Sequence, residues 1–159
     1  MAPGLNRPFA AEEWEFAGGK SLFDRARQEA RESRIDGRPD ILGSDIDARS
    51  IDLCKKHAKK AGVMVNWKVA PLKELSTDKS GGLIVCNPPY GERMMEKREA
   101  EALYREMRKK FDELDNWQVS VITAYRDFER IYGKRADKRR KLSNGGMVCT
   151  MYQYFKRND

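Results

Sequence analysis

The stretch that most constrains the fold is GGLIVCNPPYGER, residues 81–93. Its apolar run, residues 82–86, shows no alternation of polar and apolar side chains, which is typical of a strand covered on both faces of a sheet. Two consecutive prolines follow, and because proline fixes φ and cannot donate a backbone hydrogen bond, they end the strand abruptly. We therefore predict a buried strand that stops in a rigid turn at Asn87-Pro88-Pro89-Tyr90.

Helical and strand patterns alternate through the chain, which indicates an α/β fold with a mostly parallel sheet and helices on both faces. Turn chemistry at Asn144-Gly145-Gly146 predicts a C-terminal antiparallel hairpin at one edge. The first helical segment is expected to bend at Gly18-Gly19. The predicted elements are helices at 10–35, 48–61, 98–115 and 126–133, strands at 40–47, 63–69, 82–86 and 117–125, and the hairpin at 139–155.

Length and composition narrow the class of protein. A chain of 159 residues is long enough for one domain with a core and too short for two ordinary ones. A net charge of +7 favours nucleic acid as partner, although a merely soluble basic protein fits the charge equally well. The cysteines are far apart, and His57 is the only histidine. We therefore expect reduced thiols in a cytoplasmic protein, with neither a zinc site nor a disulfide framework, and see no membrane span or signal peptide.

The segment GSDID ends the strand at 40–47 with acidic residues. An acid at the carboxyl end of a parallel strand is the usual partner of both hydroxyls of a ribose, because one carboxylate accepts two hydrogen bonds. Asp45 is the ribose candidate, and Ile46 could pack on an adenine ring. Asp47 is better placed to cap the following helix, which Gly62 ends. The alternative interpretation is that both acids are only caps.

The segment NPPY carries a second pattern with chemical meaning. The side-chain oxygen of Asn87 and the carbonyl of Pro88 could both accept from one exocyclic amine, which would turn the nitrogen lone pair toward an electrophile. Tyr90 offers a flat ring on which a flipped base can stack. A rigid strand-ending turn is the alternative interpretation. The candidate catalytic residues are Asn87, Pro88, Pro89 and Tyr90. Gly91 permits a close approach, and Glu92 and Arg93 are supporting positions.

Basic residues gather in GKRADKRRK, residues 133–141. Such a cluster is typical of phosphate contacts that position RNA independently of its sequence. A solvated helix end and hairpin arm would look the same. The candidate RNA-binding residues are Lys134, Arg135, Lys138, Arg139 and Arg140.

NPPY after an apolar strand resembles motif IV of the S-adenosylmethionine-dependent amino-methyltransferases, which modify N6 of adenine or N2 of guanine. Over nearly the whole chain, the sequence resembles the 23S rRNA guanine-N2 methyltransferase family. Members of that family usually carry an N-terminal THUMP domain and are often labelled N6-adenine-specific DNA methylases. The segments that carry the resemblance are APGLNRPFA, GSDIDARSIDLCKKHAKKAGV, CNPPYGER and RADKRRKLSNGGMVCTMYQYF.

The resemblance implies a Rossmann-like sheet, S-adenosylmethionine as cofactor, and direct methyl transfer to a base amine of rRNA in the cytoplasm. Carried over by motif, Asp45 would bind the cofactor, and Asn87, Pro88 and Tyr90 would hold the target guanine. Adenine-N6 methylation of DNA uses the same motif and stays open. So does the third alternative, a catalytically inactive RNA-binding fragment.

Two departures from the family pattern stand out. The first strand and its glycine-rich cofactor loop are not found, nor is a THUMP domain, so residues 1–159 are expected to be part of a methyltransferase catalytic domain. The gap would expose strand edges, which predicts homodimerisation through them. After the strand at 63–69, where the family often has an acid, this chain has Ala70-Pro71, and the nearest acid is Glu74.

Overall fold

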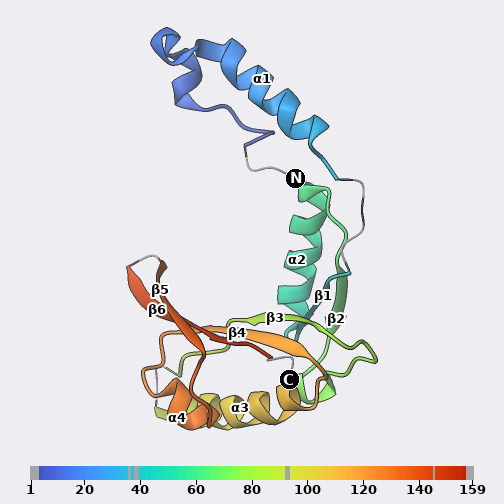
Figure 1. The fold of residues 1–159 in the computed structure, drawn as a ribbon, viewed down its shortest axis with the longest axis vertical. Helices are drawn as coiled ribbons and strands as arrows, with labels where there is room; N and C mark the ends of the chain where they lie inside the picture. The colour runs from blue at the N-terminus through green and yellow to red at the C-terminus, as the bar shows by residue number, and fades with distance from the viewer. Residues whose placement is uncertain (1–3, 36, 38–39, 92–93, 145, 157–159) are drawn as a thin grey trace. The chain divides into compact units, whose positions relative to one another are not determined.

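The computed structural model describes residues 4–35, 37, 40–91, 94–144 and 146–156. The chain divides into two compact units, residues 1–69 and 70–159, which we call the first and second unit. The first unit contains, in order, the 3-10 helices η1 (Ala10–Glu13) and η2 (Glu15–Ala17), helix α1 (Gly19–Glu32), strand β1 (Leu42–Asp45), helix α2 (Ala48–Ala61) and strand β2 (Asn66–Val69) (Figure 1).

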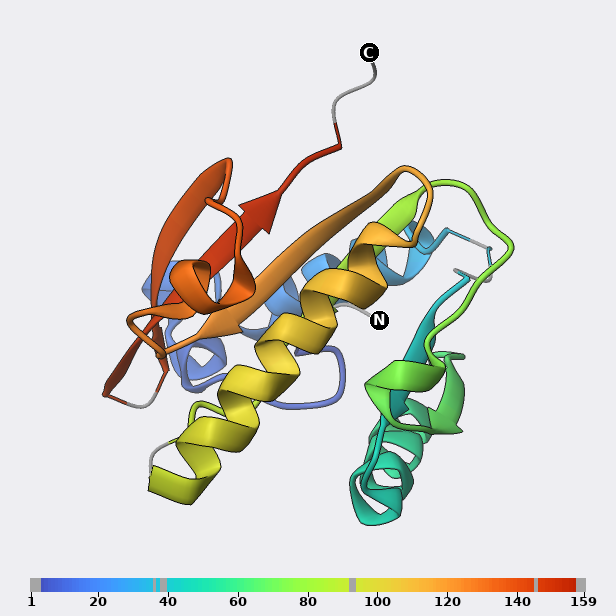
Figure 2. The same ribbon diagram turned by 90° about the horizontal axis from the view of Figure 1, so that it is seen from below.

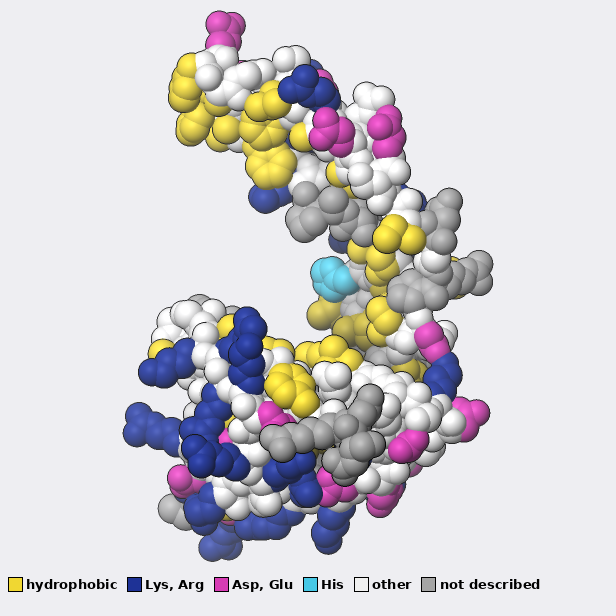
Figure 3. Space-filling model, in the orientation of Figure 1, with side chains coloured by type: hydrophobic (Ala, Val, Ile, Leu, Met, Phe, Trp, Pro, Cys, Tyr) yellow, Lys and Arg dark blue, Asp and Glu magenta, His cyan; other side chains and the backbone are white. Residues whose placement is uncertain are grey.

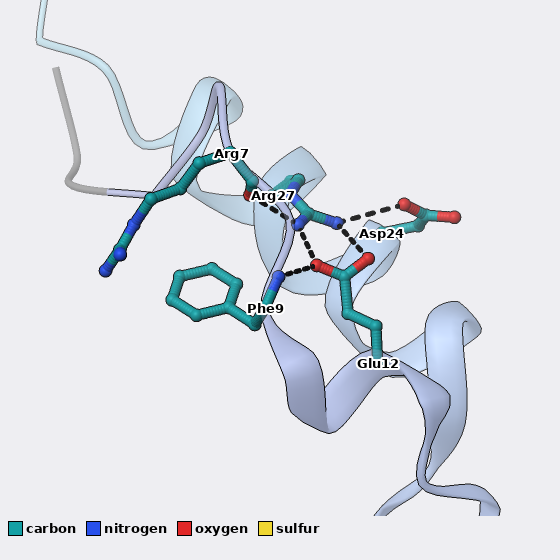
Figure 4. Close-up of polar contacts among 5 residues, drawn as sticks. All are labelled: Arg7, Phe9, Glu12, Asp24 and Arg27. Carbon is teal, nitrogen blue, oxygen red and sulfur yellow. Dashed lines mark hydrogen bonds and ion pairs between the residues drawn. The ribbon is translucent and has the colours of Figure 1, made fainter.

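The N-terminal loop of the first unit is tied to α1 by one arginine (Figure 4). Arg27 donates to the carbonyl of Arg7 over 3.0 Å and forms an ion pair with Glu12. The same Glu12 carboxylate accepts from the backbone N–H of Phe9 over 2.8 Å. The hydrogen bond from Arg27 lowers the pKa of Glu12, so the carboxylate stays charged at neutral pH. The predicted bend is confirmed, because Gly18 adopts a left-handed φ of 93° directly before α1.

Within the first unit, the strand–helix–strand segment β1-α2-β2 agrees closely with the prediction. The two strands pair in parallel. The side chain of Asp47 accepts from the backbone N–H of Arg49 over 2.9 Å, which caps α2, and Gly62 ends the helix in the left-handed conformation. Ile51 and Ala58 are buried on one face of α2. A strand–helix–strand unit therefore forms with its cap and stop at the predicted residues.

The second unit contains η3 (Leu72–Glu74), β3 (Gly82–Cys86), α3 (Met94–Asp112), β4 (Trp117–Thr123), α4 (Phe128–Tyr132), β5 (Lys138–Asn144) and β6 (Met147–Tyr154). Its strands form a sheet of order β3-β4-β6-β5. β3 and β4 are parallel, while β6 runs antiparallel to both β4 and β5. The predicted parallel strands and C-terminal hairpin are confirmed. The strands form two separate sheets, β1-β2 and β3-β4-β6-β5, and within the described residues neither β1 nor β3 has a partner on its second edge.

A glycine faces a tryptophan in each parallel strand pair. Gly43 of β1 is the register partner of Trp67, and Gly82 of β3 is the register partner of Trp117. A Cβ atom on Gly43 would lie 2.2 Å from the Trp67 ring, and one on Gly82 would lie 2.7 Å from the Trp117 ring. Each indole therefore covers its neighbour's backbone, and a larger residue at either glycine would displace it.

Helices α3 and α4 pack on one face of the second unit's sheet (Figure 2). The buried stripe of α3 contains Ala100, Met107 and Phe111. Tyr104 is fully buried in the same stripe, and Leu103 is only partly buried. Phe128 of α4 packs edge-on against Tyr104 with ring centroids 5.0 Å apart. The core consists of Ala100, Tyr104, Met107, Phe111, Val119, Val121, Phe128, Ile131, Tyr132, Tyr152 and Tyr154.

The prediction that β3 is covered on both faces is wrong for this unit. Ile84 and Cys86 pack against the core, but Leu83 and Val85 are 58% and 59% exposed. The reason is that both helices of the second unit pack on the same face of its sheet and β3 lies at its edge. An apolar run without alternation therefore did not guarantee cover on both faces. Self-association through the strand edge stays a prediction.

None of the helices in the described part of the chain has the length and apolar composition needed to cross a membrane. Within the same residues, no three His, Cys, Asp or Glu side chains gather where they could hold a metal ion.

Candidate active site at the NPPY loop

The NPPY loop leaves the carboxyl end of β3 and is held by a buried tyrosine. The hydroxyl of Tyr104 donates to the carbonyl of Pro89 over 2.7 Å and lies 3.4 Å from the hydroxyl of Thr123. Tyr104 and Thr123 are both almost fully buried. Because the two prolines fix their own φ angles, anchoring the second carbonyl fixes the path of the whole turn.

The polar side chains of the loop form a short chain of hydrogen bonds. The hydroxyl of Tyr90 donates to the side-chain oxygen of Asn87 over 2.7 Å, and the thiol of Cys149 donates to the Tyr90 hydroxyl over 3.6 Å. The hydrogen bond with Cys149 and burial raise the pKa of Tyr90, while the bond with Asn87 lowers it, and the net direction is upward. The hydroxyl therefore keeps its proton at neutral pH. An amide oxygen has two lone pairs, so the Asn87 oxygen can accept a second hydrogen bond.

A hollow of about 360 Å³ lies between the loop and α3, within the range of small-ligand sites, ~300–1,000 Å³. Gly91, which was expected to permit a close approach, approaches α3. A Cβ there would lie 2.7 Å from the Cα of Lys97. Glu92 and Arg93 lie outside the described residues. The hollow is lined by Pro89, Tyr90, Gly91, Glu96, Glu99, Ala100 and Leu103.

The two aspartates of the acidic loop after β1, Asp45 and Asp47, have different roles. Asp47 caps α2, as predicted. Asp45 is exposed, and one of its oxygens accepts from the backbone N–H of Asp47 over 2.8 Å, which orients the carboxylate at the strand end. Ile46 is 74% exposed beside it. The ribose and adenine contacts of Asp45 and Ile46 stay predictions.

The basic segment is divided between a loop and a strand. Lys134 and Arg135 follow α4, and Lys138, Arg139 and Arg140 begin β5. Arg139 donates its Nε to Glu129 over 3.0 Å and pairs with the second oxygen of that carboxylate. Glu129 also accepts from the backbone N–H of Ala136 over 2.7 Å. Figure 3 shows Lys and Arg side chains gathered around the β5–β6 hairpin.

The family model described as "RMKL-like, methyltransferase domain" matches residues 1–153. The chain belongs to this methyltransferase family. The match includes both loops described above. The expected family and Rossmann-like fold are thereby confirmed.

Individual relatives agree with the family match. YpsC of Bacillus subtilis, named as a candidate RNA methyltransferase, is 41% identical over 160 residues, covering 99% of this chain and 41% of that protein. The ribosomal RNA large subunit methyltransferase K/L of Syntrophotalea carbinolica is 33% identical, covering 96% of this chain and 23% of that protein. The chain therefore spans less than half the length of either relative.

A solved structure shows the same fold. The structure of SMU.472, a protein named as a methyltransferase and complexed with SAH, superposes with a TM-score of 0.90 and 38% identity. The superposition covers 100% of this chain and 43% of that one.

Three residues of the candidate site were not expected from sequence. Tyr104 was hidden in the apolar stripe of α3, although a tyrosine in such a stripe signals a buried hydroxyl that needs a partner. Cys149 was expected only to be a reduced thiol, and Glu129 received no role. Their contacts join segments that are 15, 59 and 10 residues apart in the chain, and no local pattern predicts such pairings.

Proposed function

We propose that this chain is the catalytic part of an S-adenosylmethionine-dependent methyltransferase that modifies an exocyclic base amine, N2 of a guanine in 23S rRNA. The observation that carries the proposal is the Asn87 side-chain oxygen, which Tyr90 orients from 2.7 Å at the end of β3. Support comes from the family match and from relatives that are named as RNA or ribosomal RNA methyltransferases. An rRNA substrate also favours a cytoplasmic location.

The residues of the first unit suit the proposed cofactor. One oxygen of Asp45 holds the turn by accepting from Asp47, and its second oxygen is left to accept from ribose hydroxyls. The exposed side chain of Ile46 suits an adenine face. When bound, S-adenosylmethionine would supply an electrophilic methyl group on sulfur.

In the proposed reaction, the chain's own residues hold the amine and leave its lone pair free. The oxygen of Asn87 and the carbonyl of Pro88 each accept a hydrogen bond from one N–H of the amine. The ring of Tyr90 stacks on the base. The nitrogen would gain the methyl group as the methyl–sulfur bond breaks and leaves a neutral thioether, and would then release one proton to solvent, so no dedicated general base is required. Because two acceptors serve either base, adenine-N6 transfer to DNA is the second candidate.

The test combines calorimetry with methyl transfer. S-adenosylmethionine is titrated into this chain and into a fusion of the chain with the N-terminal part of YpsC, because that relative carries further sequence. Labelled methyl transfer is then measured on 23S rRNA and on adenine-containing DNA. We expect transfer to guanine N2 of rRNA, and Asn87→Ala should reduce it at least ~100-fold, the scale for removing one oriented polar partner of the reacting group.

Each contrary result has a definite meaning. Transfer to DNA adenine alone would replace the proposal with the second candidate. Absence of cofactor binding and transfer from both proteins, with normal folding, would indicate an inactive RNA-binding fragment. Unchanged transfer by the Asn87→Ala variant would remove the NPPY loop from the reaction.

A further inference from the structure

We propose that RNA phosphates beside the target base bind one face of the β5–β6 hairpin, the face that carries Lys138 and Arg140, and that Arg139 fixes the hairpin from the opposite face. The inference rests on the proposed function, because it assumes that the bound polyanion is the RNA whose base reaches the NPPY loop.

The register of the hairpin places these residues. In an antiparallel pair, opposite residues share a face of the sheet, and successive residues alternate between faces. Leu142 lies opposite Cys149, and Arg140 lies opposite Met151. Lys138, Arg140 and Leu142 are therefore on the same face as Cys149. The thiol of Cys149 contacts the Tyr90 hydroxyl, so this face leads to the NPPY loop.

On the opposite face of β5, the hairpin packs against the rest of the second unit. Arg139 lies opposite Tyr152, and the Tyr152 ring packs against Phe128 of α4 with centroids 4.9 Å apart. Arg139 itself forms the two-point contact with Glu129. Lys134 lies on this side too, with its ammonium 5.7 Å from the ring centre of Tyr154. These cations stabilise the packing of the hairpin, and we assign them no phosphate contact.

The charge of the hairpin makes the face that carries Lys138 and Arg140 suitable for binding a polyanion. The hairpin, residues 138–154, contains four Lys or Arg residues and no Asp or Glu. Lys138 and Arg140 are exposed, and neither forms an ion pair with an acidic side chain of the described residues. Their opposite residues, Gln153 and Met151, are uncharged. No carboxylate on either strand therefore competes with a phosphate for these two cations.

The spacing along β5 suits contacts close to the target base. Strand residues advance ~3.4 Å each, so Arg140 lies ~7 Å along the strand from Leu142, the residue opposite Cys149, and Lys138 lies ~14 Å from it. These lengths correspond to a few nucleotides. The two side chains are therefore positioned to hold the backbone flanking a base stacked at Tyr90, which positions the base without reading its sequence.

The experiment measures RNA binding as a function of salt. A fluorescein-labelled single-stranded RNA oligonucleotide is titrated with the wild-type chain and with Lys138→Ala, Arg140→Ala and Lys141→Ala. Lys141 is the matched control, because it has the same charge, is next to Arg140 and lies opposite Thr150 on the other face. Each lost phosphate contact should lower the slope of log Kobs against log salt concentration by ~0.7. We expect that loss for Lys138→Ala and for Arg140→Ala, and no change for Lys141→Ala.

Arg139→Ala completes the set. It should lower the melting temperature while the slope for the folded variant stays at the wild-type value. Equal slope losses at Arg140 and Lys141, or none at Lys138 and Arg140, would overturn the assignment. Normal methyl transfer with such slopes would reject this surface and keep the proposed function. The expected slopes without methyl transfer, in the chain and in the fusion, would keep the surface and reject the enzyme.

Discussion

The NPPY loop and the acidic loop both follow the carboxyl end of a parallel strand, but they are held in different ways. The NPPY loop depends on distant partners. Tyr104 contacts it from 15 residues away and Cys149 from 59 residues away. The hydrogen bonds of the acidic loop join residues only two or three positions apart, from Asp45 to Asp47 and from Asp47 to Arg49 and Ser50.

This difference has a physical consequence. The geometry of the acidic loop between β1 and α2 is determined by its own sequence, because its hydrogen bonds join neighbouring residues. The NPPY loop is shaped by the packing of α3 and β6 around it, so its geometry depends on the folded second unit. The proposed function requires such long-range support at the NPPY loop, because small displacements of the acceptors of a reacting amine are costly.

After Asn87→Ala, the largest effect is expected at Tyr90, where ring and hydroxyl have separate roles. Tyr90→Ala removes the stacking surface and the hydrogen bond to Asn87, and should slow methyl transfer ~100-fold, since stacking alone contributes ~1–3 kcal/mol per base. Tyr90→Phe keeps the ring and loses the hydroxyl, with its hydrogen bonds to Asn87 and Cys149; the bond to Asn87 is worth ~1 kcal/mol or about fivefold. Single-turnover transfer to an rRNA fragment measures both, with thermal unfolding as the control for folding. Wild-type rates for Tyr90→Phe would show that the hydroxyl does not orient Asn87.

A smaller effect is expected in the acidic loop. Two variants, Asp45→Asn and Asp47→Ala, separate its contribution to cofactor binding from its contribution to stability. Asp45→Asn keeps an acceptor for the N–H of Asp47 but loses the charge, and should weaken S-adenosylmethionine binding about tenfold, or ~1.4 kcal/mol. Asp47→Ala removes the helix cap and should cost ~1 kcal/mol of stability. Calorimetric titration and thermal unfolding should therefore respond to different variants. Equal loss of binding in both would mean that Asp45 acts only through the local turn.

The same contrast explains what sequence could predict. The helix cap at Asp47, the stop at Gly62 and the rigid end of β3 arise from local chemistry, and the structure has them at the predicted residues. The Tyr104 contact needs the register of α3 against the sheet, which no short window contains. The exposure of Leu83 and Val85 also depends on which face the helices cover.

The basic segment shows an intermediate case. Its charge was visible in the sequence, but it was read as one cluster, Lys134 to Arg140. Once the segment is a strand, its period of two divides the cations between faces. Arg139 then pairs with Glu129, while Arg140 lies on the other side of β5. Alternation could have separated the two residues, but only the fold shows which face α4 covers.

The smallest effect tests whether the NPPY loop truly depends on distant support. Tyr104→Phe removes one buried hydroxyl and leaves the carbonyl of Pro89 without that donor, which should cost ~1 kcal/mol, or ~2–4 °C in melting temperature. Transfer should also slow a few-fold, because the turn that holds Asn87 loses its anchor. Thermal unfolding and single-turnover transfer measure the two effects.

The matched control is Tyr125→Phe, the same chemical change in a ring 5.4 Å away. Burial raises the pKa of Tyr125 to about 12, so its hydroxyl is protonated and donates to Glu101 rather than to the loop. Tyr125→Phe should therefore lower stability without slowing transfer. If both variants slow transfer equally, the loop responds to general loosening of the core. If only Tyr104→Phe does so, a single long-range hydrogen bond sets the position of the amine acceptors, which is the property that distinguishes the NPPY loop from the acidic loop.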